Sequence, residues 1–460
     1  MVLCLLVVSL AFSSAVFGIT VRTPVGDVIG VEKTLDIDGT PRRISVFSGI
    51  PYAESTSGAN RFMKPIPKTR FNTPFNATDL PAGCRQASDF FETYGLRYSE
   101  DCLVLSVFVP RQSDQTAQLP VMVWFYGGGF LQGTIATYPA DVLSAFGNVA
   151  VVTVNYRVGA LGFLRSSDGQ LIGNQGLWDQ HLALRWVHDN IAAFSGNPAE
   201  VTIFGESAGA ASVSLQALYP GNRGLFRRVI TESGSAVAPW AFTEHPNTDE
   251  FLSSTGCGLN VSCLQTLPAE NFRIHSLEEK VTQMFRPTVD GEFLKDTPNN
   301  ILFGEVTKNE PARNFFLSLD ILTGVNSVEG ASYVPVLQQI IGFKDVNNFT
   351  LPQESFSNTV VPYIIRSILH VNDTNKSKLL RQLISHEYSS WTDADAMADR
   401  KFALVQLMSD CVFFYPALQT AAVHRGLTGG RQSTFVYEFA VNPSNHDYIT
   451  MAWNKGVYDG

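Results

Sequence analysis

Basic residues are scarce in this chain. Its 460 residues include 33 lysines and arginines against 42 aspartates and glutamates, a formal net charge of −9 at pH 7. No basic block interrupts this balance, which argues against nucleic acid as a partner. The sequence also lacks internal repeats, low-complexity tracts, an obvious linker and any motif for a metal or a cofactor. With 45% hydrophobic residues, it predicts a globular protein with a large core that needs no cofactor.

Long apolar runs are also missing beyond the N-terminus, so we predict no transmembrane segment. The first residues, Val2 to Val8, are apolar, and Val16-Phe17-Gly18 fits a signal-peptidase site. We therefore expect residues 1–18 to be a signal peptide, although no basic side chain precedes its apolar part. A membrane anchor is the alternative, but the apolar stretch is short and strand-like sequence follows it.

Cysteines are few, and their setting fits a secretory protein. Cys4 would leave with the signal peptide, and four others could close two loops in an oxidising compartment, Cys84 with Cys102 and Cys257 with Cys263. Cys411 is left over, and its apolar neighbours predict an inert, buried thiol. Five N-x-S/T sequons, candidates for glycosylated surface loops, occur at Asn76, Asn260, Asn348, Asn372 and Asn375.

Apolar strand-like runs alternate with helical stretches along the remaining sequence. The expected strands are 120–126, 150–156, 201–204, 321–325 and 434–439, and the expected helices are 176–191 and 210–218. Alternation of this kind predicts a mainly parallel α/β sheet whose strands are buried on both faces by helices. The less regular regions, about 265–318 and 333–430, are interpreted as helical insertions over the site.

The sequence Gly205-Glu206-Ser207-Ala208-Gly209 stands between a strand-like run and a helical one. In this context the G-x-S-x-G pattern predicts a nucleophile elbow, a sharp turn that lifts a serine hydroxyl off the end of a sheet. The flanking glycines are needed because a side chain there would collide with the neighbouring strand or helix. We predict that Ser207 attacks an ester carbonyl; a plain strand-to-helix turn is the alternative.

Two further elements of an acyl-transfer site can be placed by order along the chain. Gly128 and Gly129 follow the strand that ends at Tyr126, and their N–H groups, with that of Ala208, would form an oxyanion hole. A glycine loop needed only for its turn is the alternative. Glu329 follows the strand-like run 321–325 at the point where the order Ser, acid, His requires the acid. A lone glutamate in a loop is otherwise simply solvated.

Several longer motifs lie at residues 47–53, 99–103, 155–159, 176–191, 194–198 and 204–209. Together they resemble the type-B carboxylesterase family, which includes the cholinesterases. The resemblance runs from about residue 20 to 460 and implies an α/β-hydrolase fold that hydrolyses esters through a Ser-Glu-His triad. It makes Ser207 the nucleophile and Glu329 the acid, implies both disulfides, and likens Trp240 to part of the family's acyl pocket.

The expected base departs from the family pattern. The resemblance places a histidine at the end of a long loop after strand 434–439, but this chain has Asp459 there. An aspartate has a pKa of about 3.9 and is a poor base for a serine hydroxyl. His446, in the same loop, is the tentative base; His370, His386 and His424 are expected to be structural. The sequence ends at Gly460 where the family continues, so we expect domain 19–460 to lack its C-terminal part.

Two functions follow from these residues. The first is a secreted serine esterase that cleaves a small-molecule ester. Choline esters are disfavoured, because the loop between Cys84 and Cys102 has no tryptophan to hold a quaternary ammonium. The second is a catalytically impaired, esterase-like ectodomain used for adhesion or ligand binding, which Asp459 favours.

Overall fold

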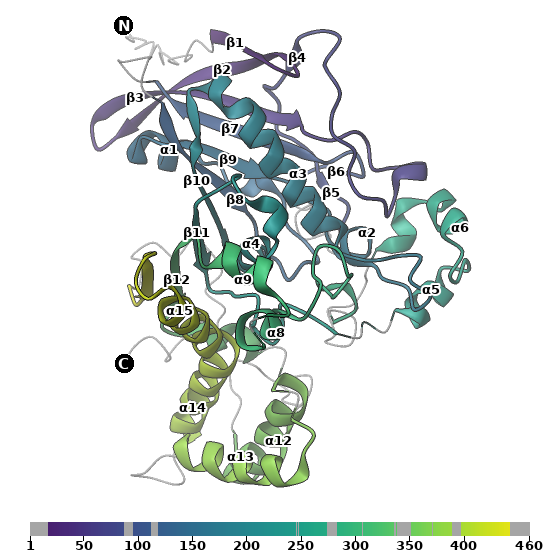
Figure 1. Ribbon diagram of the computed structural model, residues 1–460, viewed down its shortest axis with the longest axis vertical. Coiled ribbons are helices and arrows are strands. Elements are labelled where there is room, and N and C mark those ends of the chain that lie inside the picture. The colour runs from purple at the N-terminus through teal and green to yellow at the C-terminus, as the bar shows by residue number, and fades with distance from the viewer. Residues whose placement is uncertain are drawn as a thin grey trace, which may run out of the picture.

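The described part of the chain forms one large sheet of eleven strands, with helices packed around it (Figure 1). The computed structural model describes residues 17–86, 95–111, 118–244, 246, 248–273, 283–305, 307–334, 337, 351–369, 371–388 and 397–441. The strands are β1 (Phe17–Thr23), β2 (Gly26–Ile37), β3 (Thr40–Pro51), β4 (Phe75–Asn76), β7 (Val104–Pro110), β8 (Leu119–Phe125), β9 (Ala150–Val154), β10 (Gly196–Glu206), β11 (Arg228–Glu232), β12 (Asp320–Asn326) and β13 (Thr434–Phe439). Their order is β1-β2-β3-β7-β9-β8-β10-β11-β12-β13, with β4 beside β2. A separate pair, β5 (Gly83–Cys84) and β6 (Tyr98–Ser99), lies outside this sheet.

The sheet is parallel in one half and antiparallel in the other. Neighbouring strands from β9 through β8, β10, β11 and β12 to β13 all run parallel, as the alternation of strand and helix predicts. The strands β1, β2, β3, β7 and β9 pair antiparallel. Asp38 and Gly39 join β2 to β3, both with positive φ, which is the two-residue turn that Asp-Gly favours in hairpins. The resulting sheet is mixed rather than uniformly parallel.

Two apolar layers cover opposite faces of the sheet. Val123 and Ile203 belong to the large core, whereas their neighbours Trp124 and Phe204 belong to a second cluster. Successive strand residues point to opposite faces, so the two clusters lie on the two sides of the sheet. The helices α3 (Gln175–Asn190) and α4 (Ala208–Leu218) contribute to the large core, and α1 (Asp141–Gly147) packs on β3 and β7. The expected helices 176–191 and 210–218 are confirmed.

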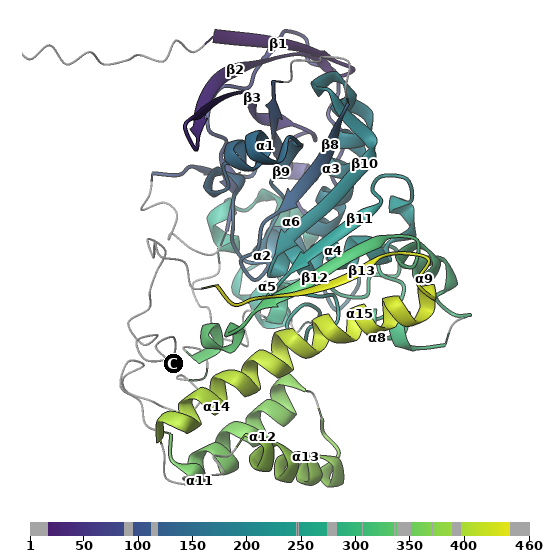
Figure 2. The same ribbon diagram turned by 90° about the vertical axis from the view of Figure 1, so that its left-hand side faces the viewer.

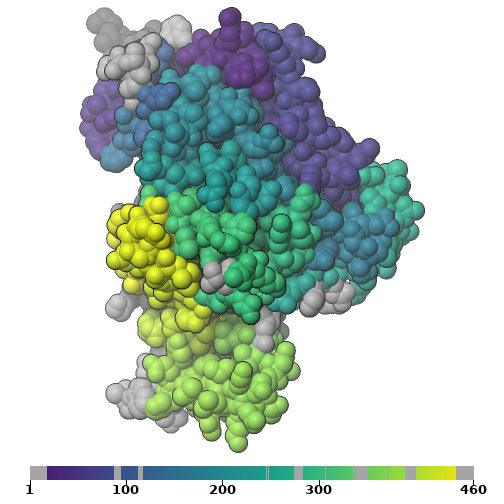
Figure 3. Space-filling view, in the orientation of Figure 1, coloured from purple at the N-terminus to yellow at the C-terminus, as the bar shows by residue number. Residues whose placement is uncertain are grey.

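A helical part extends beyond the sheet and has its own apolar core (Figures 1 and 2). It contains α11 (Gln353–Ser355), α12 (Val361–Tyr363), α13 (Thr374–Glu387), α14 (Met397–Ser409) and α15 (Tyr415–Thr428). π-Helical turns at 356–360 and 364–368 continue α11 and α12 as one helix from 353 to 368. Figure 3 shows the light-green residues around α12 and α13 as the lower end of the molecule. The helix α15, in yellow, lies higher, where it packs on β12 and β13. The shorter helices are α2 (Gly159–Phe163), α5 (Asp249–Ser254), α6 (Val261–Thr266), α8 (Pro298–Phe303) and α9 (Glu310–Phe316).

The continuous helix Arg400–Thr428 is long and apolar enough to cross a membrane by length and composition. However, 56% of its most apolar window is buried within the fold. A buried core helix has these properties, and the packing of α14 and α15 on the rest of the chain accounts for the apolar composition.

Both predicted disulfides are present, Cys84–Cys102 and Cys257–Cys263, with Cα–Cα distances of 4.9 and 5.6 Å. Such bonds persist in oxidising compartments.

Of the sequons, Asn348 lies outside the described residues, and the other four asparagines are exposed. They are not all in loops, because Asn76 belongs to β4, Asn260 caps α6 and Asn375 lies in α13. Phe17 and Gly18 begin β1, while the rest of the predicted signal peptide lies outside the described residues.

Candidate active site

Ser207 occupies a sharp turn between a strand and a helix. β10 ends at Glu206 and α4 begins at Ala208, and Ser207 between them has φ 55° and ψ −121°. A serine with positive φ costs about 1–3 kcal/mol, so the surrounding packing must hold it there. The flanking glycines explain how. A Cβ on Gly205 would lie 2.5 Å from the carbonyl oxygen of Phe125, and one on Gly209 would collide with the same oxygen.

The parallel strands β10 to β13 end at the same edge of the sheet. There, residues that directly follow one strand donate backbone hydrogen bonds to the neighbouring strand. The N–H of Ser207 donates to the carbonyl of Glu232 at 2.8 Å, and that of Ser233 to the carbonyl of Gly324 at 2.8 Å. Ligands of α/β sheets bind beyond this carboxyl edge. Ser207 is partly exposed there, as the sequence predicts for a nucleophile.

The glycine loop after β8 lies directly against the Ser207 turn. A Cβ on Gly127 would be 2.6 Å from Glu206 Oε2 and 2.9 Å from Ser207 Cβ. Gly128 and Gly129 have φ of 110° and 66°, and the Gly128 carbonyl accepts hydrogen bonds from Leu131 and Gln132. These conformations are open to glycine and rarely to other residues. Glycine is therefore required here both for the turn and for the close approach to Ser207.

The loop leaves backbone donors unused beside Ser207. Within the described part of the chain, the N–H groups of Gly128, Gly129 and Ala208 donate no hydrogen bond to protein acceptors. Ala208 is fully buried and begins α4, so its N–H is one of the unpaired donors expected in the first turn of a helix. Unused donors next to a nucleophile can stabilise negative charge that develops on a substrate oxygen.

Glu329 follows β12 and is held by hydrogen bonds. It is only 9% exposed and begins a 3₁₀ turn, Glu329–Tyr333. Its Oε1 accepts from the backbone N–H of Asn326 at 2.8 Å and from Asn326 Nδ2 at 3.3 Å. Burial raises the pKa of the Glu329 carboxyl, while hydrogen bonds from Ser233 and Asn326 act in the opposite direction. A Cβ on Gly330 would collide with the Val405 carbonyl, so α14 packs tightly on this turn.

Three carboxyl groups gather around this strand edge. Burial, with the charges of Glu329 and Glu232, raises the pKa of Glu206 to about 7. Burial also raises the pKa of Glu232. Tyr437 on β13 has a pKa raised to about 12 by burial and by the same carboxylates. The sequence did not indicate this clustering of carboxyl groups, whose mutual repulsion and burial favour their neutral forms.

The base cannot be located among the described residues. His446 and Asp459 both lie outside them. The end of β13 is nevertheless placed, because Ser327 N–H donates to the Phe439 carbonyl at 3.1 Å, two residues before Glu329. The end of β13 at Phe439 thus lies beside the segment that leads to the Glu329 turn.

Two of the other histidines after Glu329 lie in helices of the described part of the chain. His424 is fully buried in α15, and its Nδ1 pairs with Thr434 Oγ1 at 2.8 Å. His386 lies in α13, and His370 is outside the described residues. The expectation that His424 is structural therefore agrees with its surroundings. Among the described residues, no group of three or more His, Cys, Asp or Glu side chains could hold a metal ion.

Trp240 joins the strand edge to the helical part. Its Nε1 donates to the Val412 carbonyl at 3.2 Å, and its ring centroid lies 5.9 Å from that of Phe413.

Two residues that the sequence did not single out support Glu329. Asn326 Nδ2 also contacts Ser233 Oγ at 3.4 Å, and Ser233 has a positive φ of 56°. Asn326 is the last residue of β12, and Ser233 directly follows the neighbouring strand β11. For Asn326, its place at the end of the predicted strand 321–325 is the signal that could have identified it.

The comparisons with known proteins agree with this architecture. Residues 18–458 match the model of the carboxylesterase family, so the chain belongs to that family and has its α/β-hydrolase fold. It is 35% identical to bile salt-activated lipase of Rattus norvegicus over 431 residues and 36% identical to cholinesterase of Mus musculus over 428 residues. These alignments cover 88% and 87% of this chain but 65% and 66% of the relatives. Neuroligin-3 of Mus musculus is 30% identical over 464 residues, 90% of this chain and 53% of that protein. The chain thus spans just under two thirds of the first two relatives.

Proposed function

We propose that this protein is a secreted serine hydrolase of carboxylic esters that acts through an acyl-Ser207 intermediate. The observation that carries the proposal is the Ser207 turn, which packs so closely against the glycine loop that a Cβ on Gly127 would lie 2.9 Å from Ser207 Cβ. The backbone donors of Gly128, Gly129 and Ala208 are not used within the described part of the chain, which supports the same proposal. Membership of the carboxylesterase family supports the same reaction. The two disulfides support a secretory location.

In the proposed reaction, Ser207 Oγ attacks the ester carbonyl carbon while its proton passes to a base. The carbonyl oxygen becomes negative and accepts hydrogen bonds from Gly128, Gly129 and Ala208, each typically contributing about 3 kcal/mol. The tetrahedral intermediate expels the alcohol, which takes the proton, and leaves the acyl group on Ser207. Water then attacks the acyl-enzyme, releasing the carboxylic acid and restoring the serine.

Glu329 would orient the base and stabilise its charged form. We propose His446 as that base, because it lies 7 residues after Phe439, whose carbonyl is bonded beside the Glu329 turn. The substrate proposed is a small ester with apolar groups. Anionic esters are disfavoured, because the charges of Glu329 and Glu232, which raise the pKa of Glu206, would also oppose a further negative charge near Ser207.

A second candidate is an impaired esterase-like ectodomain used for adhesion or ligand binding. It is favoured by Asp459, which stands where the family resemblance expects a histidine, and by the match to neuroligin-3. Losing a triad member typically costs about 10⁴-fold or more in rate, so this candidate would retain little activity.

A fluorophosphonate probe with intact-mass detection separates the two candidates. For the enzyme we expect rapid addition of one probe molecule, abolished in Ser207→Ala and unchanged in Ser253→Ala, a matched change at an exposed serine of α5. Loss of labelling in His446→Ala would assign the base. No labelling of the native protein, with labelling gained in Asp459→His, would instead support the impaired ectodomain.

A further inference from the structure

An open groove of about 370 Å³ lies in the helical part. The helices α12 and α13 that form it stand at the end of the molecule away from α4, which follows Ser207 (Figures 1 and 2). One wall is the end of the helix that runs from 353 to 368, and the other is the beginning of α13. The two helices form a hairpin whose short connection is held at both ends. Val371 N–H donates to the Ile365 carbonyl at 2.9 Å, and Ser377 Oγ donates to the Val371 carbonyl at 3.1 Å.

The groove combines an apolar floor with a cationic rim. The apolar lining residues are Pro362, Ile365 and Val371, of which Ile365 is only 2% exposed. The charged lining residues are all basic and exposed: Arg366, Lys378 and Arg381. Apolar surface beside a few placed polar groups is typical of small-molecule sites, which commonly occupy 300–1,000 Å³.

The positive charge of the rim is not balanced locally. Arg366 and Lys378 form no ion pair with any carboxylate in the described part of the chain, and Arg381 Nη2 donates to the neutral amide oxygen of Asn358. Asp373 is the single acid in the stretch 355–386, and its carboxylate caps α13 by accepting from Lys376 N–H at 2.8 Å. A concentration of cations is unusual in a protein whose net charge is −9.

We propose that this groove binds a small organic anion with an apolar body, of the class of medium-chain alkyl carboxylates. The alkyl body would lie on Ile365 and Val371, where its burial removes apolar surface from water. The carboxylate would pair with Arg366 and Lys378, whose charged donors make stronger hydrogen bonds than neutral ones. The proposal concerns a second site and does not depend on the chemistry at Ser207.

Calorimetric titration with decanoate, below its aggregation concentration and at low ionic strength, tests the groove. We expect saturable binding that the double variant Arg366→Gln/Lys378→Gln weakens about tenfold. Lys376→Gln is the matched control, because Lys376 lies on the same helix and is exposed but does not line the groove. It should change the affinity less than twofold.

Acetate and decanol test the two halves of the proposed ligand. Acetate lacks the apolar body and decanol lacks the charge, so both should bind at least tenfold more weakly than decanoate. The proposal is overturned if the native protein shows no saturable decanoate binding, if the double variant binds as well as the native protein, if Lys376→Gln is equally damaging, or if acetate matches decanoate. Decanoate held at the Ser207 site instead would be unaffected by the double variant.

Discussion

Glu206 precedes the predicted nucleophile and carries a carboxyl group whose pKa is about 7. The cause is burial, with further contributions from the charges of Glu329 and Glu232. The sequence indicated the Ser207 turn because the required residues are adjacent and the constraint is local. It could not indicate the altered pKa of Glu206, because Glu232 in β11 and Glu329 after β12 approach it only when the sheet is folded.

The raised pKa predicts a pH-dependent effect of Glu206→Gln on stability. An unfolded glutamate has a pKa of about 4.3, so the folded state binds this proton more tightly. Stability is therefore lost as pH rises from about 4 to about 7 and does not recover above that. We expect Glu206→Gln to raise the free energy of unfolding by on the order of 2–3 kcal/mol at pH 8 and to leave it nearly unchanged at pH 4.

Urea denaturation at the two pH values measures this difference. Glu200→Gln is the control, because hydrogen bonds and ion pairs with Arg227 and Arg228 lower the pKa of Glu200. That variant should not stabilise the protein at pH 8. An equal gain for Glu206→Gln at both pH values would show that its effect is unrelated to the ionisation.

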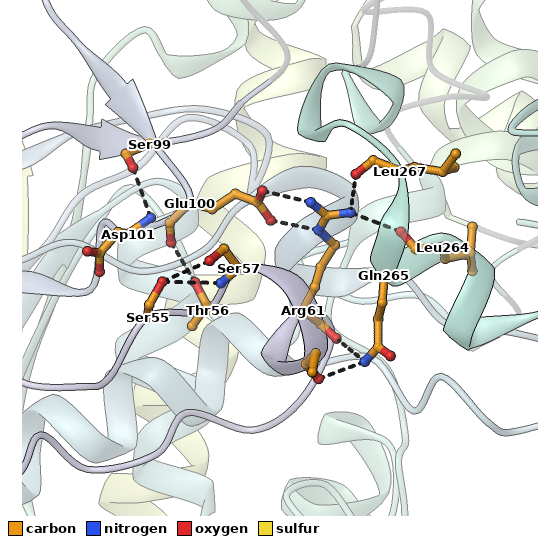
Figure 4. A network of polar contacts seen from close by, with 11 residues as sticks. Ser55, Thr56, Ser57, Arg61, Ser99, Glu100, Asp101, Leu264, Gln265 and Leu267 are labelled. Atoms are coloured by element: carbon orange, nitrogen blue, oxygen red, sulfur yellow. Dashed lines mark hydrogen bonds and ion pairs between the residues drawn. The ribbon is translucent and has the colours of Figure 1, made fainter.

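At the scale of elements, a buried ion pair joins two disulfide-closed loops (Figure 4). Arg61 Nε and Nη2 donate to the two carboxylate oxygens of Glu100, each at 2.7 Å. Nη1 of the same arginine donates to the carbonyls of Leu264 and Leu267, at 2.9 and 2.6 Å. Glu100 lies in the loop closed by Cys84 and Cys102, while the two leucines follow the loop closed by Cys257 and Cys263. One guanidinium thus fixes both loops.

We expect Arg61→Lys to lower the free energy of unfolding by about 3 kcal/mol. Lysine cannot reproduce the planar, bidentate contact, and Glu100 would remain buried with incomplete pairing. Chemical denaturation of the oxidised protein measures the change. Arg22→Lys is the control, because Arg22 pairs with Asp27 at 3.5 Å but its side chain is 89% exposed. It should stay within about 0.5 kcal/mol of the native protein; a similar small loss in Arg61→Lys would contradict the proposed role.

Strands and helices were predicted correctly where apolar residues formed a continuous run or kept a helical spacing over many residues. The expected strand 434–439 coincides with β13, and 120–126 differs from β8 by one residue at each end. β11 was not predicted, because its charged first and last residues, Arg228 and Glu232, interrupt a very short apolar run. The antiparallel strands β1 to β3 were also missed, although Asp38-Gly39 was a usable hairpin signal.

At the scale of the whole molecule, the exposure of the edge strand β13 is what the sequence did not predict. β13 is the last strand of the order within the described residues, and Figure 2 shows it at the border of the sheet beside α15. We expected it to be buried on both faces, yet Phe435 is 62% exposed and Val436 is 50% exposed. An apolar sequence predicts a strand, but its burial depends on which segments pack beyond it, and that information is not local.

An exposed, apolar edge strand is a site for pairing with another chain. We therefore expect the isolated protein to self-associate with rising concentration, and Phe435→Lys to reduce that association at least severalfold in sedimentation velocity. The folded monomer should lose little stability, because the phenylalanine is mostly exposed already. Phe146→Lys is the matched control, since Phe146 is 67% exposed but belongs to α1, where no strand edge is available. If both variants reduce association equally, general surface hydrophobicity is the cause; if neither does, β13 does not mediate the contact. A selective effect of Phe435→Lys would place the contact at β13, the edge of the parallel half of the sheet in the part of the chain that the structure describes.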